Sequence, residues 1–102
     1  MQLKHYSECK LRAEILEVIG RHLDLRRYRV FFFGSRVEGT HTEKSDIDIG
    51  IDGPEEIPGD IMVEIKEGID KLPTLYRFDI VDFRKAAPEF REGSLKSVEY
   101  VN

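Results

Sequence analysis

Two short groups of residues in the first half of the chain have types and a spacing suited to phosphate chemistry. Gly34-Ser35 ends an apolar run, and Asp46-Ile47-Asp48 follows after a loop. A Gly-Ser turn offers backbone N–H donors that a phosphate can approach closely, together with a hydroxyl, and Arg36 adds positive charge beside it. Asp-x-Asp on a strand places both carboxylates on one face, where they can share metal ions. The two groups together indicate a phosphate cradle beside a divalent-metal site.

Each group alone also has an ordinary structural interpretation. A Gly-Ser pair often does no more than end a strand, and alternating carboxylates are often a solvated strand face. A third carboxylate, Asp79, lies in the later run Tyr76–Phe83. Its presence favours a functional site over these ordinary structural interpretations. Three carboxylates gathered at one place repel one another unless a cation neutralises them, and hard oxygen ligands favour Mg²⁺ or Mn²⁺.

The periodicity of apolar residues predicts the elements that must position these groups. Helical spacing is expected over 7–25 and again over 59–72, where Pro73 ends the pattern. Strands are expected over 28–33, 46–52 and 76–83, and in the second of these the isoleucines face one side and the carboxylates the other. The residues 84–102 are expected to form a C-terminal helical tail.

The connections between these elements predict a small α/β (α+β) fold. The strand, helix and strand from residue 46 to residue 83 form a βαβ unit, so its two strands should be parallel with a right-handed crossover. The shorter link from Gly34 to Ser45 suits an antiparallel pair joined by a loop or a single helical turn. We therefore expect a mixed sheet of at least three strands flanked by helices, with Gly34-Ser35, Asp46, Asp48 and Asp79 at one edge.

Composition limits the other classes of function. The chain has 102 residues with 40% hydrophobic and 35% charged side chains, which fits a single domain over 1–102. The net charge of −4 argues against long nucleic acids as substrates. Cys9 is the one cysteine, so no internal disulfide can form, and no apolar run approaches the roughly 20 residues of a membrane span. A cytoplasmic protein is expected.

The ordered pattern resembles the minimal nucleotidyltransferases within the superfamily that includes DNA polymerase beta. The resemblance rests on Gly34-Ser35-Arg36, Gly39, Ser45-Asp46-Ile47-Asp48-Ile49 and Phe78-Asp79-Ile80-Val81-Asp82, and it covers roughly residues 11 to 83. It implies the nucleotidyltransferase fold. It also implies transfer of a nucleoside monophosphate, typically AMP from ATP, to a hydroxyl, with pyrophosphate as the leaving group.

The resemblance also implies roles for particular residues. Asp46, Asp48 and Asp79 would be the catalytic, metal-binding carboxylates for two Mg²⁺ ions, with Mn²⁺ as the alternative, and Asp79 could serve as the general base. Gly34, Ser35 and Arg36 would hold the triphosphate of ATP. Ser45 is grouped with these nucleotide-site residues, although its place before the carboxylates favours a role in fixing the loop.

Many minimal nucleotidyltransferases are encoded beside a HEPN-domain protein and act as antitoxins, some by adding AMP to the toxin. This resemblance implies a HEPN-domain toxin as the partner, in a homodimer or a hetero-oligomer. One alternative is a weak or inactive member that neutralises its partner by binding, and a third is transfer to a small molecule such as an aminoglycoside. The sequence departs from the family at Glu38, where an arginine is common, and an inward-pointing Glu38 would repel the nucleotide.

Overall fold

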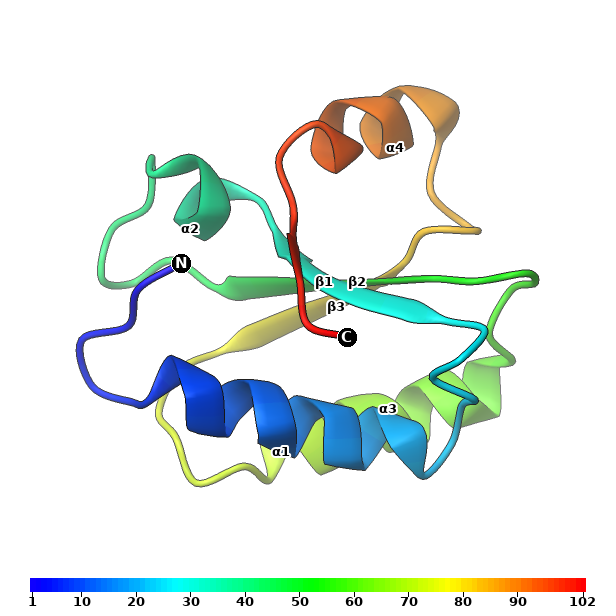
Figure 1. The fold of residues 1–102 in the computed structure, drawn as a ribbon, viewed down its shortest axis with the longest axis horizontal. Helices are drawn as coiled ribbons and strands as arrows, with labels where there is room; N and C mark the ends of the chain where they lie inside the picture. The colour runs from blue at the N-terminus through cyan, green and yellow to red at the C-terminus, as the bar shows by residue number, and fades with distance from the viewer.

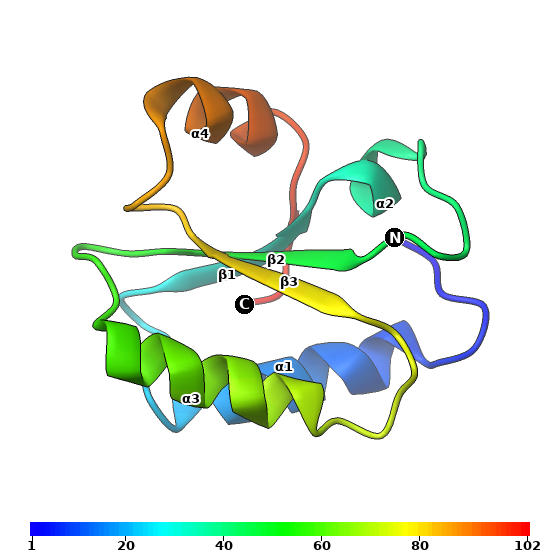
Figure 2. The same cartoon turned by 180° about the vertical axis from the view of Figure 1, so that it is seen from behind.

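The computed structural model describes residues 1–102 as a mixed sheet with helices on both of its faces (Figure 1). Helices α1 and α3 cover one face, and the short α2 and α4 lie over the other, as the view from behind also shows (Figure 2). None of the helices has the length and apolar composition that a membrane-spanning helix requires. In chain order the elements are α1 (Glu8–Gly20), β1 (Arg29–Phe33), α2 (Ser35–Glu38), β2 (Ile47–Asp52), α3 (Gly59–Asp70), β3 (Phe78–Asp82), α4 (Pro88–Leu95) and β4 (Glu99–Tyr100).

The sheet has the predicted connections and one strand more than the predicted minimum. Its order is β3-β2-β1-β4. Strand β1 is antiparallel to β2, and β2 is parallel to β3 through the α3 crossover. Of the two connections considered for the first two strands, a loop or a single helical turn, the structure has the helical turn α2, which is followed by a loop. The α/β prediction is therefore confirmed.

The main core lies between the sheet and helices α1 and α3. Ile47, Ile49 and Ile51 of β2 are fully buried, as the alternating pattern predicts. Helix α1 begins at the Ser7 cap, whose Oγ accepts a hydrogen bond of 3.2 Å from the Lys10 N–H. It ends at Gly20, earlier than predicted, and is followed by a turn in which backbone N–H groups donate to the Asp24 carbonyl.

A second, aromatic cluster lies on the other face of the sheet. Phe31, Phe33 and Phe83 are buried there, and the α4 residue Phe90 packs edge-on against Phe33 at a centroid distance of 6.0 Å. Gly50 of β2 makes room for this cluster, because a Cβ atom at that position would lie 2.3 Å from the Phe31 ring. The three consecutive phenylalanines of β1 are thus core residues, as expected of a central strand.

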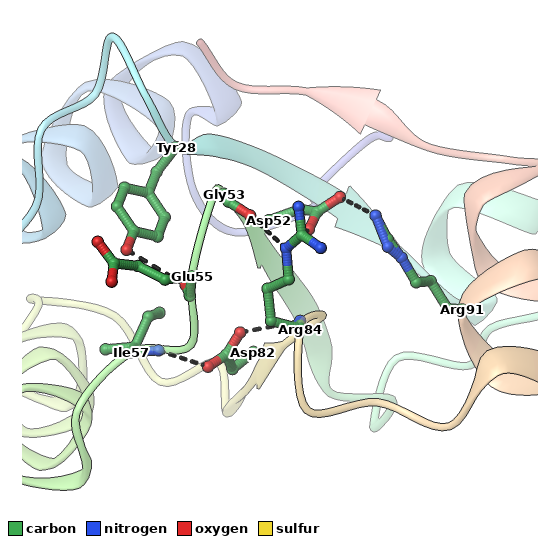
Figure 3. Close-up of polar contacts among 8 residues, drawn as sticks. All are labelled: Tyr28, Asp52, Gly53, Glu55, Ile57, Asp82, Arg84 and Arg91. Atoms are coloured by element: carbon green, nitrogen blue, oxygen red, sulfur yellow. Dashed lines mark hydrogen bonds and ion pairs between the residues drawn. The ribbon is translucent and has the colours of Figure 1, made fainter.

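The C-terminal tail differs from the purely helical prediction. Helix α4 forms over 88–95, but Glu99–Tyr100 form strand β4, which pairs antiparallel with β1. Without this strand, β1 would be an edge strand with unpaired backbone groups, and the β4 pairing satisfies some of them. An ion pair of 2.5 Å between Arg91 and Asp52 also joins α4 to the end of β2 (Figure 3).

The segment between β2 and α3 is fixed by a buried carboxylate. Asp82, at the end of β3, accepts hydrogen bonds from the backbone N–H groups of Ile57 at 2.8 Å and Arg84 at 3.0 Å (Figure 3). These contacts lie at the opposite end of β3 from Asp79. Asp82 therefore has a structural role in this molecule.

Candidate active site

The sheet register brings the predicted site residues of three strands to one end of the sheet. Asp48 of β2 is aligned with Phe33, the last residue of β1, and with Asp79 of β3. Gly34 follows Phe33 directly. Asp46 is exposed and lies one residue before β2. Gly34, Asp48 and Asp79 are therefore neighbours on the face that α1 and α3 leave uncovered.

Gly34 is in direct contact with the Asp48 carboxylate. Its φ of 81° is one that side chains disfavour, and an added Cβ atom would lie 2.1 Å from Asp48 Oδ2. Only glycine fits here without displacing the carboxylate. The turn expected to hold phosphate thus meets the carboxylate that is expected to hold a metal ion.

The acidic group carries negative charge that no side chain neutralises. The side chains of Asp46, Asp48 and Asp79 take part in none of the hydrogen bonds or ion pairs that hold the rest of the chain. Burial, and then the charges of Asp79 and Asp46, raise the pKa of Asp48 to about 6. A cation bound at this place would relieve both effects, so the donor set fits a hard divalent metal.

The structure does not arrange these carboxylates as a complete metal centre. No group of three or more His, Cys, Asp or Glu side chains is placed to hold a metal ion. Asp48 and Asp79 are paired by the register, whereas Asp46 lies just outside the strand. The fold of the chain therefore brings two of the three predicted carboxylates, Asp48 and Asp79, side by side.

The side chain of Arg36 is placed differently from the predicted phosphate contact. It is 5% exposed, and its Nε donates to the Ser45 carbonyl at 2.9 Å while Nη2 donates to the Glu43 carbonyl at 3.2 Å. Its guanidinium also lies over the Tyr76 ring, 5.0 Å from the centroid. In this structure Arg36 holds the loop between α2 and β2.

The other predicted nucleotide-site residues lie on the same loop or at its start. Ser35 is half-buried and begins α2, where the N–H groups of Val37 and Glu38 donate to the Gly34 carbonyl. Ser45 Oγ accepts a hydrogen bond of 3.0 Å from the Thr42 N–H, so it fixes the loop as its position suggests. Glu38 is exposed in this structure. Its side chain therefore does not have the inward orientation that would repel a nucleotide.

None of the three predicted carboxylates lines any of the four main cavities of the chain. A cavity of about 550 Å³ lies to one side and is lined by residues including Tyr6, Leu72 and Tyr76. Tyr76 also lines a second cavity of about 240 Å³ with Arg36. Sequence reasoning missed Tyr76, because an aromatic residue just before a strand is common and carries no distinguishing signal.

Comparison with known proteins shows which proteins this chain resembles in sequence and fold. The chain is 27% identical over 89 residues to the "Probable protein adenylyltransferase MntA" of Haemophilus influenzae, covering 85% of this chain and 78% of that protein. A solved toxin–antitoxin structure with AMP-PNP matches with a TM-score of 0.73 and 19% identity, over 89% of this chain and 72% of that chain.

A second solved structure has the same fold. It contains the tri-AMPylated HEPN toxin of Shewanella oneidensis in complex with its MNT antitoxin, and it matches with a TM-score of 0.69 and 15% identity, over 91% of this chain and 70% of that chain. The profile of the family described as "Polymerase beta, Nucleotidyltransferase" matches residues 27–101, which include every predicted site residue. The chain therefore belongs to the polymerase beta nucleotidyltransferase family.

Proposed function

We propose that this chain transfers AMP from ATP to a hydroxyl group of a HEPN-domain toxin and thereby acts as its antitoxin. The observation that carries the proposal is the contact of Gly34 with the Asp48 carboxylate, which is itself aligned with Asp79. The turn that we propose to bind phosphate thus lies beside two carboxylates on the face that α1 and α3 leave uncovered. We place the reaction in the cytoplasm, where ATP is abundant and the free thiol of Cys9 stays reduced.

In this proposal Asp46, Asp48 and Asp79 hold two Mg²⁺ ions, or Mn²⁺ in their place. Such ions, when bound, neutralise the charge of the triphosphate and of the departing pyrophosphate. The carboxylates lack protein cations, so a metal would not have to displace an existing ion pair. The backbone N–H groups of the Gly34-Ser35 turn and the Ser35 hydroxyl bind phosphate oxygens.

Asp79 is the residue proposed to activate the acceptor hydroxyl. It is exposed at the beginning of edge strand β3, where an incoming hydroxyl can reach its carboxylate. Asp79 accepts the hydroxyl proton while the acceptor oxygen forms a bond to the α-phosphorus of ATP. The bond from that phosphorus to the oxygen bridging the α- and β-phosphates breaks, and pyrophosphate leaves.

A protein acceptor suits the open shape of the site. None of the four main cavities is lined by Asp46, Asp48 or Asp79, so these cavities would not bury a small acceptor beside the carboxylates. A partner protein can bring its own hydroxyl to an open face and exclude water by covering it. The name of the Haemophilus influenzae relative and the AMPylated HEPN toxin in the Shewanella oneidensis complex support this acceptor class.

Intact mass spectrometry of a co-purified HEPN-domain partner tests the proposal. The chain, the partner, ATP and Mg²⁺ are incubated together, and the partner should gain the mass of one or more AMP groups. Asp46→Ala and Asp79→Ala should abolish the gain, whereas Asp70→Ala, which removes an exposed carboxylate at the end of α3, should not. AMP transfer by both site variants would contradict the assigned roles.

The same experiment separates catalysis from neutralisation by binding. If the partner is inhibited as a stoichiometric complex, with no gain of mass in the presence of ATP, the chain is a binding module and the proposed reaction is wrong. In a parallel reaction that also contains an aminoglycoside, AMP on that small molecule in preference to the partner would show that the proposed acceptor class is wrong.

A further inference from the structure

Arg36 is the one arginine of this chain that is almost completely buried, and its contacts are all within the chain. It lies on α2, immediately after the Gly34-Ser35 turn. A buried guanidinium must satisfy its N–H groups to offset its desolvation, and here backbone carbonyls accept from it. Its position is therefore defined by the neighbouring backbone.

The first contacts of Arg36 fix the loop segment that leads to the carboxylates. The two N–H groups of its planar fork donate to the carbonyls of Ser45 and Glu43. Asp46 follows Ser45 directly, and β2 begins at Ile47. The guanidinium thus fixes the distance between the phosphate turn and the start of the carboxylate strand.

The remaining contact of Arg36 reaches the segment that leads to Asp79. Its guanidinium lies over the ring of Tyr76, 5.0 Å from the centroid, and Tyr76 precedes β3. Next to this contact the Ile47 N–H donates to the Arg77 carbonyl at 2.8 Å. This hydrogen bond joins the start of β2 to the segment that precedes β3. The three parts of the candidate site therefore meet around one side chain.

We propose that Arg36 is a positioning residue, which sets the spacing of the phosphate turn, the Asp46–Asp48 strand and the Asp79 strand. It does so through the loop carbonyls and Tyr76, and it is not a ligand of the triphosphate. The expected effect of Arg36 on the rate of AMP transfer rests on the proposed nucleotidyl transfer. The expected effect of Arg36 on the order of the loop does not rest on it, because that effect concerns the chain without nucleotide or partner.

Amide hydrogen exchange of the full chain, without nucleotide, tests the structural consequence. The amides of Ser45 and Ile47 are the probes, since they donate to the Thr42 and Arg77 carbonyls. In Arg36→Met both should exchange about tenfold faster or more, because two charge-assisted hydrogen bonds are lost, while the amides of α1 keep their rates. Arg21→Met removes an exposed arginine from a remote surface and should change neither probe.

Two further variants keep the test decisive if Arg36→Met does not fold. Arg36→Lys keeps the charge but cannot donate from a fork, and Tyr76→Leu removes the ring beneath the guanidinium; each should accelerate the same two amides. The effects of Arg36→Lys and Tyr76→Leu should be less than additive, because both act on one contact. Unchanged probes in all variants, or a uniform acceleration across the chain, would overturn the positioning role.

Kinetics with ATP distinguish positioning from a phosphate contact. A positioning residue should lower kcat about tenfold or more when changed to Lys, with the KM for ATP nearly constant. A rise in the KM for ATP at constant kcat would make Arg36 a phosphate ligand and overturn the inference. If the wild-type chain transfers no AMP, the proposed function fails, and the exchange rates of Ser45 and Ile47 still decide the positioning role.

Discussion

Asp48 should destabilise the folded chain at neutral pH in the absence of a divalent cation. Its pKa rises from 3.8 to about 6 because burial and the charges of Asp79 and Asp46 disfavour the carboxylate. Asp48→Asn keeps the shape and removes the charge, so the variant should be more stable than the wild type. The full shift of about 2 pKa units corresponds to about 3 kcal/mol, and partial solvent exposure of Asp48 reduces the expected gain to about 1–2 kcal/mol.

The pH dependence of this gain follows from proton linkage. Well below the unfolded-state pKa of Asp48 the carboxyl is protonated in both states, so the charge costs nothing. As the pH rises to about 6 the unfolded state releases its proton first, and wild-type stability falls relative to Asp48→Asn; above that pH the difference stays constant. The variant should therefore gain little at about pH 3, part of the difference by about pH 5, and most at about pH 7.5.

Urea unfolding with EDTA, followed by circular dichroism, measures the difference, and Asp70→Asn is a control for removal of an exposed carboxylate. Added Mg²⁺ should stabilise the wild type and should stabilise Asp48→Asn less, since binding to the folded state adds to its stability. A variant less stable than the wild type at neutral pH in EDTA would refute the reasoning. Equal stabilisation of both proteins by Mg²⁺ would refute the metal assignment.

Three other substitutions have outcomes that the structure predicts. Gly34→Ala should cost about 1–2 kcal/mol more stability than Gly39→Ala in thermal unfolding. Both glycines have positive φ, but only Gly34 lacks space for a Cβ atom. Equal losses would show that the approach of Gly34 to the Asp48 carboxylate is unimportant. Arg91→Met should cost about 1 kcal/mol and raise protease cleavage within α4, because it leaves Asp52 without its 2.5 Å partner, and unchanged cleavage would contradict this. Asp82→Ala should cost about 2–3 kcal/mol in urea unfolding, because it leaves two backbone N–H donors unsatisfied. A loss below about 1 kcal/mol would contradict this structural role of Asp82.

The arrangement of the main strands and of the carboxylates could be predicted from local patterns. The alternation from Asp46 to Asp52 predicts which face of β2 is buried, because the side-chain period of a strand is two. A βαβ connection predicts the parallel pairing that aligns Asp48 with Asp79. These features depend on short-range periodicity and on chain geometry, which a single sequence displays.

The contacts of Arg36 and the pairing of β4 could not be predicted in this way. An arginine after a Gly-Ser turn suits a phosphate contact, and only the folded loop shows that the Ser45 and Glu43 carbonyls accept its hydrogen bonds. Likewise, Glu99–Tyr100 form a strand because β1 offers an open edge, while the tail itself has helical spacing. Both depend on which distant groups the fold brings together.

The position of the label in ATP tests the central claim most directly. The chain and its HEPN-domain partner are incubated with Mg²⁺ and ATP labelled in the α-phosphate, and in a parallel reaction with ATP labelled in the γ-phosphate. Nucleotidyl transfer predicts stable label on the partner from the α-phosphate alone, with the γ-label recovered in pyrophosphate. Label on the partner from the γ-phosphate, or no label from either, would contradict the account.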